Sequence, residues 1–389
     1  MSKWKNRNTH KDISASVISE KSTEVLQKAH KFIEGIFEFR KTKKLYDTYA
    51  IGVENALENN GEDRVYVDYK VDGTVTGRLS CSQYQRKNEK GDPVKMGVSF
   101  HTLPRIDDEG GNEIDVRGIR GCFIAPKGSA FITADQKAEE LRVLAHIADE
   151  KNMIKAFYSG EDLHKYTASL IFKKPISEIS KKERQVAKTV SFLIVYGGGA
   201  FNLANTVGIS IKEAEHIVNR YHKVFPGVSA YMEEVNKFTL ENKYIETIFG
   251  RRRNLLNVDS KDKSVVYRAL RQALNFTIQS PSTDIILLSG VGINYDIQRL
   301  KLDARLAAFV HDSIEGICKF EHLEDYLIIL YEHMINNPTM KERFNINFRV
   351  NFEIDVEVGH SFGDGVAVKY KDGKPTNMDE IIGYLNGKT

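Results

Sequence analysis

Four side chains in the segment ERQVAKTVSFLIVYGGGAF recur at a spacing of four residues: Arg184, Lys188, Phe192 and Tyr196. On an α-helix this spacing keeps side chains on nearly one face, so two cations would be followed by two aromatic rings. Two like charges at this spacing repel each other unless an anion lies between them. A triphosphate would supply that anion, and the rings would offer a surface on which a base can stack. The stripe therefore predicts a nucleotide laid along a helix, although an amphipathic helix with a solvated cationic start and a buried aromatic end also explains it.

Two aspartates stand at the ends of apolar segments that are typical of buried strands. Asp135 follows AFITA, and Asp312 lies between LAAFV and SIEGIC, where a tight hairpin is expected. Each of them alone could be a turn or helix-capping residue. As a pair at the edge of one sheet they could hold two Mg²⁺ ions, since magnesium takes one or two carboxylates and leaves positions for water and substrate phosphates. Two such ions, about 4 Å apart, promote phosphoryl transfer.

The segments that must position these residues predict a mixed α+β fold. Helical spacing runs over residues 23–39, 39–57, 264–293 and 323–335, and helical patterns dominate residues 139–242. Strand patterns are expected at RVYVDYKV, on both sides of Pro126, on both sides of His311 to Ser313, and at FRVNFEIDVEVG. NKYIETIFGRRR predicts a short hairpin or loop, and residues 85–115 predict an irregular excursion. We expect the AFITAD and AAFVHD strands to share one small sheet, with a helical body inserted between them.

The composition restricts the function only loosely. The chain has 389 residues, 41% of them hydrophobic, and a net charge of +3, so a nucleic-acid-binding surface would have to be local. Three widely separated cysteines argue against a disulfide framework and against a zinc site. The polar N-terminal segment, residues 1–22, is not typical of a signal peptide, and no apolar run approaches the roughly 18 residues of a membrane span. A reducing cytosolic compartment and no membrane partner are expected.

Six segments, in order, resemble the family A DNA polymerases, the bacterial DNA polymerase I type. VTGRLSC is similar to the primer-binding TGRLSS segment, ADQKAEELRVLAH to motif A, and RQVAKTVSFLIVYG to motif B. FGRRR matches the segment after the fingers, RQALNFTIQSPSTDII resembles RxxxNxxxQGxxADII, and VHDS resembles motif C. The resemblance runs from about Phe37 to Gly365. It implies a right-hand polymerase fold and a template-directed DNA polymerase that adds dNTPs to a primer 3′-OH by two-metal-ion phosphoryl transfer.

The resemblance also implies a role for each matched residue. The catalytic residues would be Asp135, Asp312 and Lys188, the two aspartates binding two Mg²⁺ ions for which Mn²⁺ can substitute. Contacts to the incoming nucleotide are implied for Arg184, Lys188, Phe192, Tyr196, Glu140 and His164. Contacts to primer-template DNA are implied for Arg78, Arg271, Asn275, Gln279 and His311. Glu140 would be the steric gate against a ribose 2′-OH. Simpler interpretations stay open: Arg271 and Gln279 could form a solvated helix face, and Glu140 could be an ordinary surface carboxylate.

Motifs A, B and C each depart from the family pattern. Motif A usually reads ADYSQIELRxxAH, so Ala138 and Glu139 replace a Gln and an apolar residue. Ser313 replaces the Glu of motif C, and Ser191 replaces the usual Asn of motif B. Residues 83–115 make a long excursion after TGRLSC. Local hydrogen bonds and minor-groove contacts are therefore expected to differ from those of the family.

The resemblance predicts four regions: an N-terminal tail with partial thumb helices (1–62), a first palm part (63–150), fingers (151–262) and a second palm part (263–389). The thumb would be a shortened helical one, and no carboxylate set for proofreading precedes the palm. Weak DNA binding would follow, unless a companion chain supplies exonuclease and thumb. The protein is expected in the cytoplasm of a bacterial or phage-infected cell, associated with the nucleoid; an organelle is not excluded. The alternatives are a single-subunit RNA polymerase, against which Glu140 argues, and a DNA-binding relic or accessory subunit that needs a partner chain.

Overall fold

The computed structural model describes residues 20–87, 90–95, 97–103 and 117–387. It forms two compact units, one from residues 1–68 and 83–99 and the other from residues 69–82 and 100–389. Residues 1–19 of the predicted N-terminal tail and residues 104–116 of the predicted excursion lie outside the described residues. All residues implied in catalysis or binding belong to the second unit.

The first unit is mainly helical. It contains α1 (Glu20–Lys44), a π-helical turn (Leu45–Ala50), α2 (Ile51–Asn60) and the hairpin of β3 (Gln85–Lys87) with β4 (Pro93–Lys95). The prediction that two helices meet near residue 39 is wrong, because α1 continues to Lys44 and the irregular turn follows it. The second helical pattern was expected to run to residue 57, and α2 ends close by at Asn60. Gly61 follows in the left-handed conformation that glycine adopts without strain, with φ of 65°.

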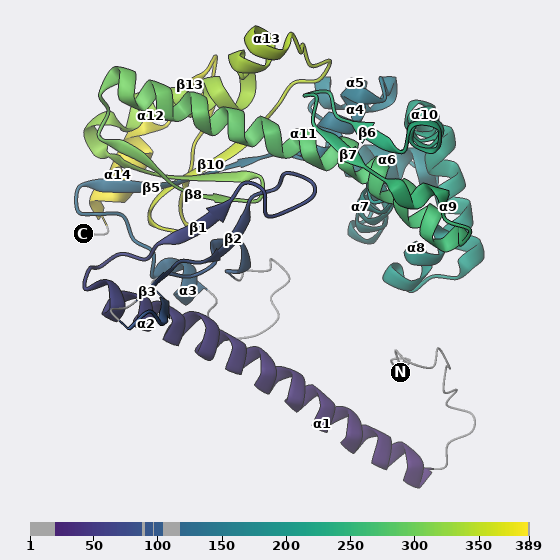
Figure 1. Ribbon diagram of the computed structural model, residues 1–389, viewed down its shortest axis with the longest axis horizontal. Helices are drawn as coiled ribbons and strands as arrows, with labels where there is room; N and C mark the ends of the chain where they lie inside the picture. The colour runs from purple at the N-terminus through teal and green to yellow at the C-terminus, as the bar shows by residue number, and fades with distance from the viewer. Residues whose placement is uncertain (1–19, 88–89, 96, 104–116, 388–389) are drawn as a thin grey trace. The chain divides into compact units, whose positions relative to one another are not determined.

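The second unit is built around an antiparallel sheet of five strands (Figure 1). The strands follow the spatial order β11, β10, β5, β9, β8, with bounds Asp364–Ala367, Ile354–Ser361, Ser129–Gln136, Ser313–Lys319 and Ala304–Val310. The two predicted strands with terminal aspartates are thus neighbours, since β5 pairs with β9 and β9 forms a hairpin with β8. The expectation of one small sheet that contains both is confirmed.

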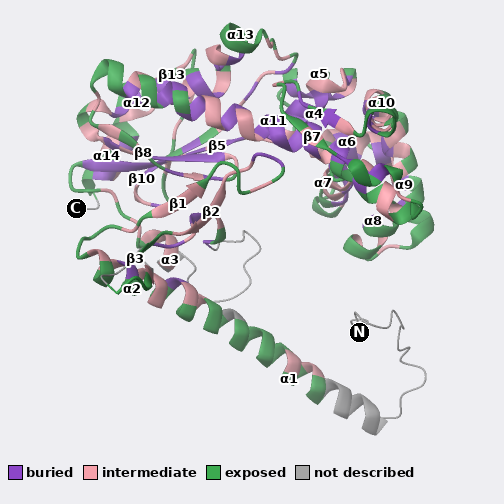
Figure 2. Cartoon of the chain, in the orientation of Figure 1, coloured by how far each residue is buried: buried purple, intermediate pink, exposed green. Residues whose placement is uncertain are grey.

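The two faces of this sheet differ in polarity because successive side chains point to opposite sides. On one face Ala130, Ile132 and Ala134 of β5 pack with β9, β10 and three helices into a buried apolar cluster. On the other face Thr133 donates a hydrogen bond of 2.7 Å to the Glu315 carboxylate. Asp135 lies two residues after Thr133 on the same strand, so its side chain points to this polar face. Figure 2 shows β5 as largely buried, whereas α11 carries buried, intermediate and exposed residues along its length.

The helical part of the second unit lies between β5 and β8 in sequence. Its elements are α4 (Glu139–Ile147), α5 (Lys151–Tyr158), α6 (Leu163–Phe172), α7 (Lys181–Val195), α8 (Ala200–Val207), α9 (Ile211–Val224), α10 (Pro226–Asn242), β6 (Tyr244–Glu246), β7 (Arg252–Asn254) and α11 (Lys263–Leu300). The hairpin of β6 with β7 confirms the predicted hairpin. Helix α11 contributes Leu274 and Ile278 to the core of the helical part, and Ile286 and Ile293 to the core beneath the sheet. It therefore ties the two cores together.

The remaining elements are shorter. They are β1 (Val67–Lys70), β2 (Ser80–Gln83), α3 (Arg117–Gly121), α12 (Leu323–Tyr331), α13 (Pro338–Phe344), β12 (Tyr370–Lys371), β13 (Lys374–Pro375), α14 (Met378–Gly387), the π-helical turn Glu332–Asn336, and 3₁₀ turns at Phe100–Thr102, Ile176–Glu178, Leu256–Asp259 and Phe320–His322. The prediction of a strand before Pro126 is wrong, because that segment forms only an isolated bridge from Ile124 to Ser361. Of the described helices, none combines the length and apolar character needed to span a bilayer.

Candidate active site

Backbone pairing places Asp135 and Asp312 side by side. Asp135 lies directly opposite Ser313, and the N–H of the next residue, Gln136, donates to the carbonyl of Asp312 at 3.1 Å. His311 and Asp312 form the two-residue connection between β8 and β9, as predicted. His311 has φ of 61°, which is uncommon for a residue with a side chain, and such backbone strain gathers at functional sites. The two carboxylates thus stand at the same edge of one sheet.

Helix α4 follows directly and adds two more acidic side chains. Ala138 precedes the helix with φ of 49°, so the chain turns sharply after β5. Glu140 accepts hydrogen bonds from Arg78 at 2.6 Å and from the hydroxyl of Tyr196 at 3.3 Å. Burial raises the pKa of Glu140, while the Arg78 guanidinium and the side chain of Gln279 act in the opposite direction. Side chains implied in nucleotide binding and in DNA binding therefore meet at Glu140.

The predicted stripe begins in a well-formed helix. Ser180 and Glu183 make a reciprocal capping box at the start of α7, which fixes where the helix begins. Arg184 forms an ion pair of 2.8 Å with Asp162, and that carboxylate also caps α6 through the N–H groups of residues 164 and 165. Lys188, one turn further on, is exposed. The cationic start of the stripe is thus solvent-accessible, as both sequence interpretations required.

The aromatic end of the stripe contacts other predicted residues. Phe192 lies 6.0 Å, centroid to centroid, from the ring of His164. Burial lowers the pKa of His164 to about 4, and the nearby cations Arg184 and Lys188 act in the same direction while Asp162 opposes them. The imidazole is therefore neutral at pH 7. Three residues of the predicted nucleotide site, Arg184, Lys188 and His164, are electrostatic neighbours.

Tyr196 follows the last residue of α7 instead of lying within the helix, which corrects the expectation that all four stripe residues are helical. Tyr196 remains 45% exposed, and its partial burial raises the pKa of its hydroxyl. The next residue, Gly197, has φ of 64°, and the side chain of Arg271 passes so close that a Cβ there would overlap it. Gly197 therefore follows the end of α7 and lies against Arg271 of α11.

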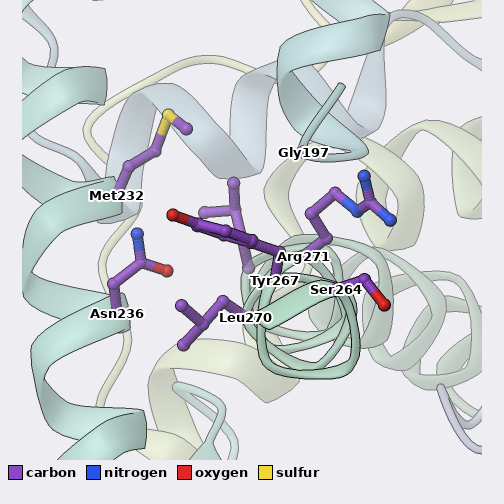
Figure 3. A pocket seen from close by; sticks show the side chains of 8 residues that line it. Gly197, Met232, Asn236, Ser264, Tyr267, Leu270 and Arg271 are labelled. Atoms are coloured by element: carbon purple, nitrogen blue, oxygen red, sulfur yellow. The ribbon is translucent and has the colours of Figure 1, made fainter. Parts of the chain in front are cut away.

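The first half of α11 displays three residues implied in DNA binding. Gln279 reaches Glu140, and the Nδ2 atom of Asn275 is buried without a protein hydrogen-bond partner. Arg271 lines a pocket of about 470 Å³ together with Gly197 and residues of α10 and α11. Figure 3 shows the exposed Tyr267 ring and Arg271 rising from one helix, with Met232 and Asn236 facing them from α10. The pocket combines a cation, an aromatic ring and an amide.

Arg78 and His311, the other two residues implied in DNA binding, lie in a second small cluster. Both line a pocket with His101, whose ring stacks on His311 at a centroid distance of 5.0 Å. His101 contacts the carbonyl oxygen of Phe309 at 3.0 Å, and Tyr69 donates to the same oxygen at 2.7 Å. Burial lowers the pKa of His101. The interpretation of the sequence missed His101, because it lies in a segment to which no role was assigned.

The carboxylates at the sheet edge suit a divalent cation in their chemistry. In the described part of the chain, no group of three or more His, Cys, Asp or Glu side chains is arranged to hold a metal ion by itself. Two aspartates on adjacent strand ends still fit magnesium, which takes few carboxylates and completes its shell with water and phosphate oxygens. The buried oxygen Oε1 of Glu139, close by on α4, has no protein hydrogen-bond partner. The sequence marked Glu139 only as a departure from a motif.

Comparison with known proteins gives consistent matches. The model of DNA polymerase family A matches residues 1–364. DNA polymerase I of Treponema pallidum is 33% identical over 87% of this chain and 31% of its own length. The thermostable DNA polymerase I of Thermus aquaticus is 31% identical over 75% of this chain and 32% of its own length. The chain therefore spans about a third of the length of these curated relatives.

A solved structure resembles the fold over nearly the whole chain. It is described as the POL domain of Pol1 from M. smegmatis in complex with DNA primer-template and dNTP. The TM-score is 0.75 at 27% sequence identity, and the match covers 93% of this chain and 58% of that one. The α+β architecture with a small antiparallel sheet is thus shared with a polymerase domain.

Proposed function

Because the chain belongs to DNA polymerase family A, we propose that it catalyses template-directed addition of deoxynucleotides to the 3′-OH of a DNA primer. The observation that carries this proposal is the register between β5 and β9, which brings Asp135 and Asp312 to one sheet edge. Two aspartates at this spacing suit Mg²⁺, with Mn²⁺ as a substitute. When bound, the two ions would activate the attacking hydroxyl and stabilise the leaving oxygen.

The helix stripe would bind the incoming nucleotide. Arg184 can give up its ion pair with Asp162 to a triphosphate, because a partly exposed ion pair contributes only about 0–1 kcal/mol. Lys188 adds a second cation. A phosphate between Arg184 and Lys188 would remove the repulsion between these two side chains. Phe192 and Tyr196 then lie one and two turns further on, where the sugar and base would extend.

Glu140 would select the sugar. The Arg78 guanidinium and the Tyr196 hydroxyl hold its carboxylate from two sides, so the side chain cannot swing away to admit a larger sugar. A ribose 2′-OH would meet this fixed carboxylate, whereas deoxyribose has no atom there. The same contact couples the nucleotide stripe to Arg78, which would touch the primer.

Primer and template would lie along α11 and the β8–β9 turn. Arg271, Asn275 and Gln279 recur every four residues on α11, a spacing that keeps them near one face of the helix. The buried Nδ2 of Asn275 has no hydrogen-bond partner in the protein. The pocket beside Arg271 offers the exposed Tyr267 ring, on which an unpaired template base could stack. The neighbouring solved structure, whose description names primer-template and dNTP, supports this arrangement.

The regional division follows from the same proposal. Residues 63–150 and 263–389 would form the palm, to which β5 and β8–β11 contribute from both ranges. Residues 151–262 would form the fingers, which include α5 to α10 and the stripe. The long helix α11 begins beside the stripe and continues beneath the palm sheet, which would let it carry finger movements to the metal site.

Primer extension on a short DNA template tests the proposal. The protein is incubated with Mg²⁺ and either dNTPs or rNTPs, with Asp312→Asn and Asp355→Asn beside the wild type. Asp355 lies opposite Asp135 on β10 but is ion-paired with Lys137 and mostly exposed, so it is a matched control. We expect extension with dNTPs that disappears in Asp312→Asn and persists in Asp355→Asn. No extension by the wild type, at low salt and high enzyme concentration, would overturn the proposal.

A further inference from the structure

Glu139 is a buried carboxyl group at a position where the related motif has an apolar residue. It is the first residue of α4 and is only 4% exposed. Its oxygen Oε1 has no hydrogen-bond partner in the protein. Burial of an unsatisfied carboxyl group is costly, so such a group usually has a partner that the polypeptide does not supply.

The surroundings of Glu139 show what kind of partner is missing. The groups that act on it are the carboxylates of Asp312, Glu140 and Asp135, which repel its negative charge, and the Arg78 guanidinium, which attracts it. Arg78 already donates to Glu140. Burial, followed by the Asp312 carboxylate, raises the pKa of Glu139 well above its ordinary value. A buried carboxyl group that lies among three partly buried carboxylates calls for a cation.

A second acidic residue near Asp135 provides a comparison. Asp355 lies directly opposite Asp135 on β10, where two like charges would repel. Its carboxylate forms a 2.7 Å ion pair with Lys137 and is 68% exposed. The protein thus neutralises Asp355 with its own lysine and leaves Glu139 without an equivalent partner.

We propose that Glu139 is a third acidic side chain of the divalent-metal centre of Asp135 and Asp312, and that it strengthens binding of the cation. The inference rests on the proposed function, because it deepens the metal site named there. Because no described group of three or more His, Cys, Asp or Glu side chains is arranged to hold a metal ion by itself, Glu139 would act on the ion as a nearby charge or through a metal-bound water. The centre of this chain would then bind its metal more tightly than one with an apolar residue at this position.

The test measures Mn²⁺ binding to the full chain without nucleotide or DNA, from the electron paramagnetic resonance signal of free Mn²⁺. Glu139→Gln keeps the size and removes the charge, and Glu139→Ile restores an apolar residue. We expect both variants to raise the Kd for Mn²⁺ about fivefold to tenfold, because a carboxylate facing a dication is lost. Asp355→Asn is the matched control and should stay within about twofold, because Lys137 neutralises that carboxylate and solvent screens it. Thermal unfolding of each variant shows that it is folded.

The Asp312→Asn variant distinguishes failure of the role proposed for Glu139 from failure of the metal centre itself. If Asp312→Asn weakens Mn²⁺ binding but both Glu139 variants bind as the wild type does, the role of Glu139 is overturned and the two-aspartate centre stands. If Asp312→Asn leaves Mn²⁺ binding unchanged, the metal centre itself is overturned together with the inference. Tighter binding by Glu139→Gln would also contradict the proposal, since a neutral side chain would then serve the cation better.

Discussion

Asp135 and Asp312 are positioned by the backbone hydrogen bonds of a sheet, whereas Arg184, Lys188, Phe192 and Tyr196 are positioned by a single helix and its C-terminal end. The sheet edge is surrounded by buried groups, including Glu139 and Glu315. The stripe is open to solvent, and Arg184 is engaged with the replaceable partner Asp162. The comparison indicates a preorganised centre for chemistry beside a surface that can exchange ligands.

The largest expected effect is at the sheet edge. Asp135→Asn keeps the shape of the side chain and the strand pairing but removes a carboxylate that would hold the metal. We expect the single-turnover rate of primer extension to fall about 10³-fold or more, since metal-assisted charge stabilisation contributes several kcal/mol. The Kd for primer-template, measured by fluorescence anisotropy, should change little. A rate within tenfold of the wild type would contradict the distinction between the two regions.

The cations of the stripe should have a smaller effect that appears mainly in nucleotide use. Lys188→Ala and Arg184→Ala each remove a charge-assisted contact of about 1.5–3 kcal/mol, so kcat/KM for dNTP should fall about 10- to 100-fold. Lys182→Ala removes the same charge from an exposed position of the same helix and serves as the control. If Lys182→Ala were as impaired as Lys188→Ala, general charge and not the stripe would explain nucleotide binding.

The contact between the two regions should control sugar selection. Glu140→Ala removes the carboxylate that Arg78 and Tyr196 hold, and we expect the preference for dNTP over rNTP to fall about tenfold or more. Glu140→Gln keeps the size of the side chain and should retain most of the preference. The measurement is the ratio of kcat/KM for the two nucleotides. An unchanged ratio in Glu140→Ala would separate Glu140 from the sugar.

The sequence was informative where periodicity alone determines the structure. Apolar strands that end in Asp135 and Asp312 predicted a shared sheet, and the spacing of four residues from Arg184 to Tyr196 predicted the stripe. The junction near residue 39 was placed too early, because the π-helical turn at Leu45–Ala50 leaves no clear trace in an apolar pattern. The segment before Pro126 looked like a strand, but proline lacks the N–H that a strand interior requires, and only a single bridge forms.

The candidate site was only partly predictable, because pairwise contacts between distant segments have no local signature. Nothing around position 78 indicates that Arg78 meets Glu140, and nothing around Tyr196 indicates its contact with the same carboxylate. His101 was missed for this reason, since its partner His311 is far away in the sequence. The sequence did mark Glu139 as a charged residue at a position where the related motif has an apolar one. Its burial and the missing hydrogen-bond partner of its Oε1 are visible only in the structure.

The smallest expected effect is the contribution of His164 to the pH dependence of the protein's stability. It tests whether the surroundings of the stripe are closed to solvent at His164. An exposed histidine has a pKa near 6.5, whereas burial, together with Arg184 and Lys188, lowers the pKa of folded His164 to about 4. Above about pH 6.5 the imidazole is neutral in both states and contributes no pH dependence. As the pH falls from 6.5 to 4, the unfolded chain binds a proton that the folded chain resists, so stability decreases over this window.

His164→Gln removes this proton uptake, so the difference in Tm between wild type and variant should shift by a few degrees between pH 7 and pH 4.5, against the wild type at the lower pH. Taking the difference cancels the groups that titrate independently of His164. His216→Gln, the same substitution at an exposed position of α9, is the matched control. A difference for His164→Gln that does not change with pH would mean that solvent reaches the imidazole. The surroundings of His164 would then be as open as those of the exposed Lys188, in contrast to the buried Glu139 beside the sheet edge.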